Sequence, residues 1–120
     1  MNKIEIAYVD DDAIYGSVLD AFFTDGNELI IKFFNSQKEY KNNYMKTADI
    51  SFLISDFHMK GELNGIDFIN RERHKHNYAL VVSNDENVCH TCHINGIVFL
   101  GKEKLVNYIE GIELGVTCQL

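Results

Sequence analysis

The sequence contains no proline, only three cysteines and no long apolar run. Its apolar stretches are far too short to cross a bilayer, which takes about 20 consecutive apolar residues. The N-terminus also lacks the basic and then apolar pattern of a secretory signal. We therefore expect a cytoplasmic protein with no membrane partner. In that compartment an odd number of cysteines favours thiols over a disulfide framework.

Basic residues are also scarce, because 11 lysines and arginines stand against 18 aspartates and glutamates, and the formal net charge is −7. Binding to a nucleic-acid backbone needs clustered basic side chains. We therefore expect no direct nucleic-acid partner. The densest basic segment, Arg71 to His76, is interpreted first as the solvated end of a helix and second as a docking surface for an acidic partner.

The length and composition of the chain suit one folded domain that spans residues 1–120. A chain of 120 residues and 13.8 kDa can bury roughly two-thirds of its unfolded surface without disulfides or a structural metal. Apolar residues make up 46% and charged residues 24% of the sequence, which is ordinary globular usage. Neither disorder nor a fibrous structure is indicated.

Five short runs of β-forming residues alternate with segments that have a helical pattern. Asp12 is a candidate N-cap for the first helix, which Asp25-Gly26-Asn27 should end, and Ser36 with Glu39 forms a capping box before the second. This alternation predicts an α/β fold with a doubly wound, parallel, five-stranded sheet. The strands are expected at 4–9, 29–34, 50–55, 79–82 and 97–100. The helices are expected at 13–24, 37–48, from 66 into the polar segment that follows Asn70, and at 105–112, with at best a small helix within 87–94.

Four of these strands end in residues capable of chemistry: Asp10 and Asp11, Asp56, Ser83, and Lys102. Each alone could be a cap, a turn residue or a solvated charge. In open parallel sheets, however, ligands bind outside the carboxyl ends of the strands. Three carboxylates brought together must raise a pKa or bind a cation, and a site with only oxygen ligands favours Mg²⁺.

A carboxylate beside Mg²⁺, an ammonium and a hydroxyl supplies the groups that phosphoryl transfer requires. Asp56 is the expected nucleophile and would become an aspartyl phosphate. Asp11 and Asp56 are expected to hold the metal directly, and Asp10 through water. Lys102 would pair with the phosphoryl group, and Ser83 would hydrogen-bond one of its oxygens.

The motifs around these residues carry a resemblance to a known family. The chain resembles, over essentially its whole length, a response-regulator receiver domain of bacterial two-component systems and is similar to the stand-alone chemotaxis type. The matching segments are Val9-Asp10-Asp11, Asp56-Phe57-His58-Met59, Asn64-Gly65-Ile66, Val82-Ser83 and Phe99-Leu100-Gly101-Lys102.

The resemblance implies a flavodoxin-like sheet with strand order 2-1-3-4-5. It implies phosphorylation of Asp56 by a histidine kinase or a histidine phosphotransfer protein, and Mg²⁺-dependent autodephosphorylation; the domain is a phosphoacceptor more than an enzyme. The backbone carbonyl of His58 would complete the metal site. Ser83 and Phe99 would form the switch that changes binding to an output protein, which the sequence does not name. We expect a monomer or a weak dimer.

Several positions depart from the family pattern. Lys60 stands where proline often follows Met59, and Glu103 follows Lys102 where a cis proline is usual. A cis bond before a residue other than proline costs roughly 2.5 to 4 kcal/mol, so we expect a trans bond and a shifted Lys102 loop. His58 and the segment Asn84-Asp85 should alter access to the phosphoryl group, and the fourth helix is short.

Two alternatives remain open. The chain could be a degenerate receiver that acts as a constitutive interaction or dimerisation module. The segment Cys89-His90-Thr91-Cys92-His93 matches the C-x-x-C-H haem-attachment pattern, which is disfavoured because no export signal is visible. A zinc or redox site could instead use Cys89, Cys92 and His93 from one helix face, with Cys118 as a fourth ligand; otherwise the cysteines pack as small hydrophobes.

Overall fold

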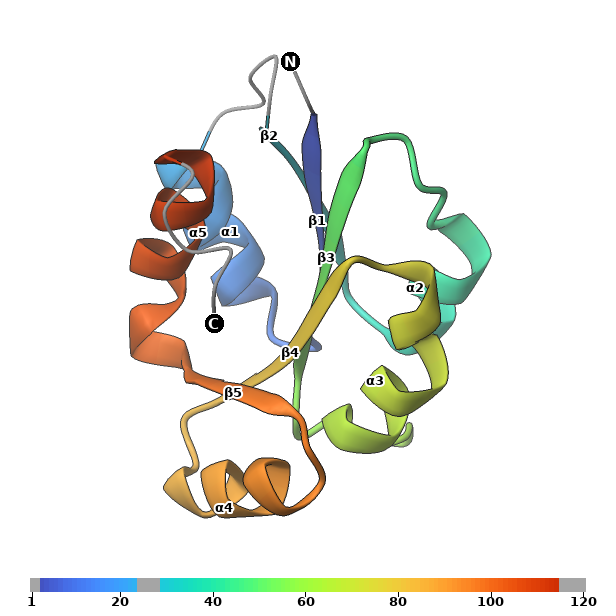
Figure 1. Ribbon diagram of the computed structural model, residues 1–120, viewed down its shortest axis with the longest axis vertical. Coiled ribbons are helices and arrows are strands. Elements are labelled where there is room, and N and C mark those ends of the chain that lie inside the picture. Colours follow the sequence, from blue (N-terminus) through green and yellow to red (C-terminus); the bar gives the residue numbers. More distant parts are fainter. Residues whose placement is uncertain (1–2, 24–28, 115–120) are drawn as a thin grey trace.

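The computed structural model describes residues 3–23 and 29–114, and its centre is a parallel sheet of five strands (Figure 1). The strand order is β2-β1-β3-β4-β5. Both the predicted fold class and the predicted order are confirmed. The strands are β1 (Ile4–Val9), β2 (Leu29–Phe34), β3 (Ile50–Asp56), β4 (Tyr78–Ser83) and β5 (Val98–Gly101).

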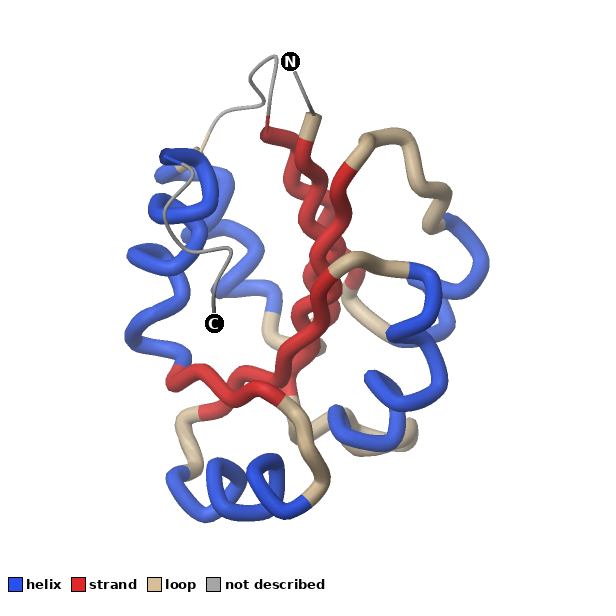
Figure 2. The backbone as a smooth tube through the Cα atoms, viewed as in Figure 1, coloured by secondary structure: helices blue, strands red, loops and turns tan. Residues whose placement is uncertain are grey.

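Helices cover both faces of the sheet, which forms a single layer between them (Figure 2). Side chains from α1 and α5 pack on one face, and side chains from α2, α3 and α4 pack on the other. The helices are α1 (Ala13–Phe22), α2 (Gln37–Asn43), α3 (Gly65–Glu72), α4 (Glu86–Ile94) and α5 (Leu105–Leu114), with 3₁₀ turns at Arg73–Lys75 and Lys102–Lys104. No helix in the described ranges is long and apolar enough to cross a membrane.

The central strands are apolar on both faces because both faces are covered. Alternate side chains of a strand point in opposite directions, so Ala7 and Val9 join the core under α2, α3 and α4. Ile6 and Tyr8 join the core under α1 and α5. A strand buried on both sides cannot show the simple apolar and polar alternation of a half-exposed strand.

The predicted helix starts are confirmed by their caps. The Asp12 carboxylate accepts a hydrogen bond from the Ile14 N–H at 3.0 Å, and the Ser36 hydroxyl accepts one from the Glu39 N–H at 3.0 Å. The Asn64 side-chain oxygen accepts a hydrogen bond from the Asp67 N–H at 2.9 Å. Each bond satisfies an N–H that has no partner inside its helix.

Two predicted boundaries differ from the structure. The helix expected to reach Ala48 ends at Asn43, because the chain becomes extended at Tyr44 and its hydroxyl donates to the buried Glu5 carboxylate at 2.7 Å. The weakly patterned segment after Asp85 forms a full helix of nine residues. The predicted end of the first helix at Asp25-Gly26-Asn27 lies outside the described residues.

Tyr40, Ser51 and His76 form a polar network at the amino end of the sheet. His76 lies between Tyr40, whose hydroxyl is 2.7 Å from Nε2, and Ser51, whose hydroxyl is 3.0 Å from Nδ1. Burial lowers the pKa of His76 from 6.5 to about 4. The folded protein therefore holds a neutral imidazole at pH values where the unfolded chain already binds a proton.

This neutral histidine predicts acid sensitivity. The stability that His76 contributes is complete above pH 6.5 and is lost as the pH falls towards 4. Between pH 7 and pH 5 the free energy of unfolding should fall by about 2 kcal/mol more in the wild type than in His76→Gln. Urea unfolding at both pH values measures this difference. His74→Gln, which changes an exposed histidine, should behave as the wild type does; equal pH dependence in all three proteins would contradict the assignment.

Candidate functional site

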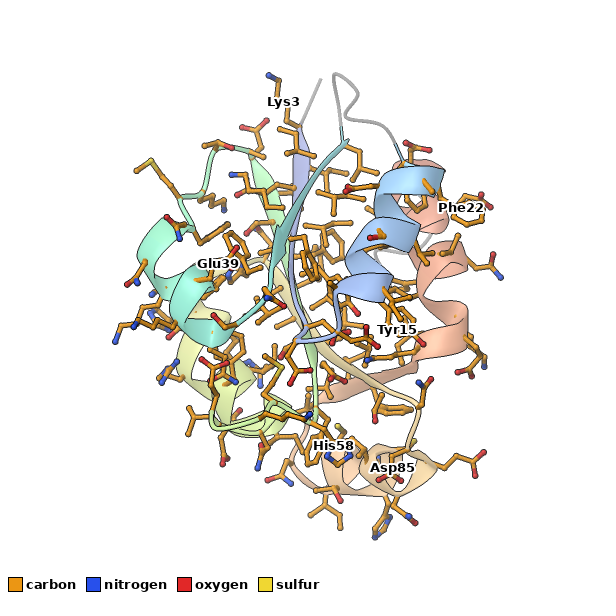
Figure 3. The ribbon with its side chains drawn as sticks, turned by 180° about the vertical axis from the view of Figure 1, so that it is seen from behind. Lys3, Tyr15, Phe22, Glu39, His58 and Asp85 are labelled. Atoms are coloured by element: carbon orange, nitrogen blue, oxygen red, sulfur yellow. The ribbon has the colours of Figure 1, made fainter. Side chains whose placement is uncertain are left out.

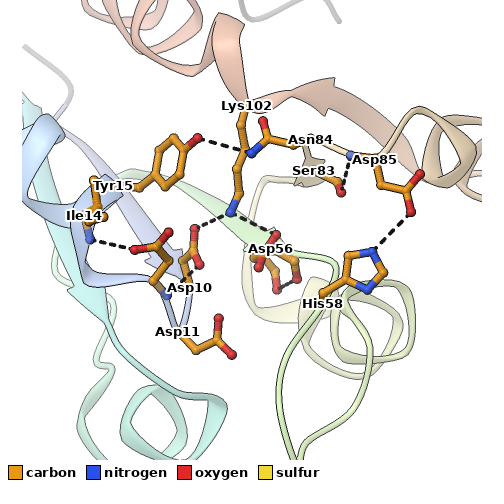
Figure 4. Close-up of polar contacts among 12 residues, drawn as sticks. Asp10, Asp11, Ile14, Tyr15, Asp56, His58, Ser83, Asn84, Asp85 and Lys102 are labelled. Atoms are coloured by element: carbon orange, nitrogen blue, oxygen red, sulfur yellow. Dashed lines mark hydrogen bonds and ion pairs between the residues drawn. The ribbon is translucent and has the colours of Figure 1, made fainter.

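Acidic and basic side chains meet at the carboxyl ends of the central strands (Figure 4). Asp10 directly follows β1, Asp56 is the last residue of β3, and Lys102 directly follows β5. The parallel register places Asp56 beside Val82, and Ser83 beside Gly101. Four groups that are distant in the sequence therefore lie at one edge of the sheet.

Three carboxylates form the centre of this site. Asp10, Asp11 and Asp56 each offer one oxygen, and these oxygens lie within 4.8 Å of one another. Asp10 is fully buried and Asp56 is 6% exposed, whereas Asp11 is exposed. A cation could therefore approach from the Asp11 side and meet oxygen ligands alone, as Mg²⁺ prefers.

Asp10 is the most heavily hydrogen-bonded of the three carboxylates. Its Oδ2 accepts from the Lys102 ammonium at 2.9 Å and from the Tyr8 hydroxyl, and its Oδ1 accepts from the Asp12 N–H at 2.9 Å. Burial and the neighbouring Asp10 charge raise the pKa of Tyr8, so its hydroxyl stays protonated and donates. Both oxygens of Asp10 are already engaged, which suits a contact with a metal through water.

The Lys102 ammonium joins the two buried carboxylates. It lies 2.9 Å from Asp10 and 3.2 Å from Asp56, and its side chain is only 7% exposed. Although burial favours the neutral amine, the Asp10 hydrogen bond and the Asp56 charge raise the pKa of Lys102. The described peptide bonds are all trans, as expected for the bond before Glu103. Without a cis bond at this position, Lys102 still reaches both carboxylates.

Tyr15 of α1 supports the other side of the ammonium. The Lys102 Nζ lies 4.5 Å from the centre of the Tyr15 ring, which is within the range of a cation–π interaction. The Tyr15 hydroxyl accepts a hydrogen bond from the Asn84 side chain at 3.3 Å (Figure 4). Tyr15 therefore links the lysine to the loop that follows Ser83, a contact that the sequence analysis did not anticipate.

The two unpredicted tyrosines differ in how far the sequence could have revealed them. Tyr8 precedes Asp10 by two residues on a strand, so both side chains must point to the same face. That spacing was a usable signal. Tyr15 meets Lys102 across the fold, and no spacing within the sequence indicates such a contact.

Asp56 carries the clearest electrostatic perturbation in the site. Burial, and then repulsion by Asp10, raise the pKa of Asp56 to about 6, against the opposing effect of Lys102. At pH 7 the carboxylate is mostly ionised but only weakly stabilised in that form. A bound cation would favour its ionised state, because an opposite charge nearby lowers a carboxyl pKa.

The loop after β3 is held by backbone contacts. The Phe57 N–H donates to the Val82 carbonyl at 3.1 Å, and the Gly65 N–H donates to the Phe57 carbonyl at 2.8 Å. A Cβ on Gly65 would lie 2.5 Å from the Asp56 carbonyl oxygen, so only glycine fits there. The Lys60 N–H donates to Asp11 Oδ2 at 3.1 Å, a bond that proline at this position could not make.

His58 and Asp85 face each other beside Asp56 (Figure 4). The His58 Nε2 lies 3.4 Å from Asp85 Oδ2 (Figures 3 and 4). His58 comes from the loop after β3 and Asp85 from the loop after β4. These two departures from the family pattern therefore form one contact between the loops.

The predicted switch residues lie on neighbouring strands. Ser83 is 3% exposed, and its hydroxyl accepts a hydrogen bond from the Asp85 N–H at 3.0 Å. Phe99 is half-buried against the core under α2, α3 and α4 and pairs in register with Val81. Ser83 ends its strand at the same sheet edge as Asp56.

The structure does not favour the alternative of a metal or redox site on Cys89, Cys92 and His93, because these side chains do not face the same environment. Cys92 is fully buried in the core, whereas Cys89 and His93 are exposed. Burial raises the pKa of Cys92 to about 11, with a further contribution from Cys89. Cys92 packs as a small apolar residue, as the simpler interpretation held, and Cys118 lies outside the described residues.

Comparisons with known proteins reveal similarity only at the level of structure. No protein-family model matches the sequence, and no curated protein does. A response regulator receiver protein from Pseudoalteromonas atlantica is 18% identical, with a TM-score of 0.68 over 92% of this chain and 98% of that one. A receiver protein from Pseudomonas putida is 20% identical, with a TM-score of 0.66 over 93% and 97%.

The receiver domain of RcsB from Escherichia coli, in its non-phosphorylated form, is 18% identical, with a TM-score of 0.70 over 95% of both chains. This chain spans only 62% of the Salmonella typhimurium RcsB response regulator and 45% of LqsR from Legionella pneumophila. The receiver domains from P. atlantica, P. putida and E. coli overlap more than nine-tenths of this chain with TM-scores of 0.66 to 0.70, so the chain has the fold of response-regulator receiver domains.

Proposed function

We propose that this chain is a phosphoacceptor receiver domain of a two-component or phosphorelay system, modified on Asp56. The observation that carries the proposal is the Lys102 ammonium, bound to Asp10 and Asp56 beside the open Asp11 carboxylate. The receiver-type fold supports it. The proposed phosphodonor is a histidine kinase or a histidine phosphotransfer protein, and the proposed location is the cytoplasm.

The carboxylate cluster fits Mg²⁺ by the chemistry of its donors. Asp11 and Asp56 would hold the ion directly, together with the backbone carbonyl of His58, and Asp10 would act through water. Asp11 is exposed and Asp10 is already hydrogen-bonded on both oxygens, which agrees with these different roles. When bound, Mg²⁺ would neutralise charge on the phosphoryl oxygens.

The positions of the protein groups support the following transfer step. An Asp56 carboxylate oxygen attacks the phosphorus of a phosphohistidine, a P–O bond forms, and the P–N bond breaks. The imidazole keeps the bonding electron pair. Lys102 pairs with a phosphoryl oxygen, and the Ser83 hydroxyl donates to another. Attack by water on the aspartyl phosphate later releases inorganic phosphate and restores Asp56.

Phosphorylation would act on the surface of α4, β5 and α5 through Ser83 and Phe99. The Ser83 hydroxyl oxygen accepts a hydrogen bond from the Asp85 N–H, so a movement of Ser83 towards a phosphoryl oxygen on Asp56 would also reposition the loop after β4. Phe99 would move inward as that loop moves. The change is a shift between two populations, limited by how differently the phosphoryl group interacts with each.

A mass measurement tests the proposal. Incubation with Mg²⁺ and phosphoramidate should add one phosphoryl group to the wild type, and the addition should disappear in Asp56→Ala and when EDTA replaces Mg²⁺. Asp67→Ala, which removes an exposed carboxylate of α3, should be modified normally. Absence of modification in the wild type would overturn the proposal in favour of a degenerate receiver that acts as a constitutive interaction module. Modification that persists in Asp56→Ala would overturn the assignment of the site.

A further inference from the structure

Basic side chains gather on one side of an acidic molecule. Helices α1 and α5 contain no lysine or arginine, whereas α2, α3 and their loops carry most of the positive charge, on the opposite face of the sheet (Figure 1). Seven of the 11 basic residues lie between positions 38 and 75: Lys38, Lys41, Lys46, Lys60, Arg71, Arg73 and Lys75.

A groove runs between α2 and the loop that leads into α3. A hollow of about 410 Å³ is lined by Lys38, Lys41, Leu63 and Arg71. It adjoins a second hollow that shares Lys38 and includes Lys60. We call these five residues and the hollows between them the α2–α3 groove. Its walls combine cationic groups with the apolar Leu63 side chain, which is 38% exposed.

Two of the carboxylates near this groove, Glu62 and Glu72, are already engaged by neighbouring groups. Glu62 accepts the backbone N–H groups of Gln37 and Lys38 at 2.8 and 3.1 Å. Glu72 is paired with Arg71 at 3.1 Å and with Lys75 at 2.8 Å. Within residues 3–23 and 29–114, the ammonium groups of Lys38, Lys41 and Lys60 have no ion-pair partner. Their charge therefore remains available to an incoming ligand.

Arg71 is fixed in position although it is 45% exposed. Its Nε donates to Glu72, and its guanidinium carbon lies 5.6 Å from the centre of the Phe68 ring. Lys38 and Lys41 are three residues apart on α2 and so lie on the same side of that helix. Together these groups present a fixed guanidinium and two adjacent ammonium groups around Leu63.

We propose that the α2–α3 groove docks a short acidic peptide segment of a partner protein. Its carboxylates would meet Lys38, Lys41 and Arg71, and one apolar side chain would cover Leu63. A long polyanion such as nucleic acid suits the groove less well than a short segment, because it would extend beyond the lysines to Asp11 and Asp12 at one end of the groove and over the rest of a molecule whose net charge is −7. This docking does not depend on phosphorylation of Asp56.

Fluorescence anisotropy on the full chain tests the docking site. The probe is a labelled peptide of alternating glutamate and aspartate with one central leucine, and the matched peptide carries glutamine and asparagine instead. We expect saturable binding of the acidic peptide alone. The double variant Lys38→Glu/Lys41→Glu should weaken it at least about tenfold, which corresponds to about 1.4 kcal/mol. The control Lys3→Glu/Lys104→Glu has the same net charge as this double variant and should lose much less affinity for the acidic peptide.

Three outcomes of the binding measurements would overturn the proposal: equal binding of both peptides, equal weakening by both double variants, or tighter binding of a single-stranded oligonucleotide of matched charge. Amide chemical-shift changes should concentrate on α2 and the loop before α3, and changes confined to α1 and α5 would also overturn it. Asp56→Ala should bind the peptide as the wild type does, so failure of the phosphorylation test leaves this result interpretable. Far-UV circular dichroism shows whether the surface variants are folded.

Discussion

Replacing Lys102 by methionine should destabilise the metal-free protein by about 3 kcal/mol at pH 7. Methionine keeps an unbranched side chain but leaves Asp10, which is fully buried, and Asp56 without their shared cation. Removing one partner of a buried ion pair typically costs about 3 to 5 kcal/mol, because the remaining charge stays buried. Protonation of Asp56 would relieve part of this cost, which places the expectation at the lower end.

Added Mg²⁺ should recover part of the stability lost in Lys102→Met, because a cation that binds the folded state alone stabilises it. Urea unfolding with EDTA and with Mg²⁺ measures both effects. The matched control is Lys104→Met, which changes an exposed lysine two residues further on and should stay close to the wild type. If both variants unfold at the same urea concentration as the wild type, the ion pair does not stabilise the fold as argued.

Periodicity and caps were sufficient to predict most of the fold. Asp12 and Ser36 cap the helices that their patterns predicted, and each expected strand exists within one or two residues. Predictions failed where a tertiary contact overrode the local pattern. Tyr44 continues the helical spacing of Tyr40, but its hydroxyl bonds to Glu5 of the neighbouring strand, and the helix ends before it.

The candidate site was predictable because a parallel sheet brings the ends of its strands together. Asp56 lies 46 residues after Asp10, and Lys102 lies 46 residues after Asp56, yet topology alone places all three at one edge of the sheet. What topology could not supply was the packing around them. The Tyr15 ring beneath Lys102 and the burial of Cys92 depend on where helices settle against the sheet, which no short motif encodes.

Replacing Asp56 by asparagine should have the opposite effect on stability and raise it in the metal-free protein. Burial and Asp10 hold the pKa of Asp56 at about 6, against 3.8 for an unperturbed carboxyl group. The folded state therefore binds this proton more tightly than the unfolded state does. The contribution of Asp56 to stability falls as the pH rises from about 4 to about 6, and the full penalty of up to about 3 kcal/mol remains at pH 7.

Asparagine has nearly the shape of the protonated acid and carries no charge, so the gain of Asp56→Asn should be largest above pH 6 and nearly vanish at pH 4. Unfolding in urea with EDTA at pH 4, 5.5 and 7 measures the trend, and Asp67→Asn on the surface of α3 should show no comparable gain. Mg²⁺ should narrow the difference at pH 7, because it stabilises the wild type through a carboxylate that the variant lacks. If Asp56→Asn is no more stable than the wild type at pH 7, the ionised Asp56 carboxylate does not destabilise the folded state as argued. The negative charge that makes Asp56 a nucleophile would thus lower the free energy of unfolding.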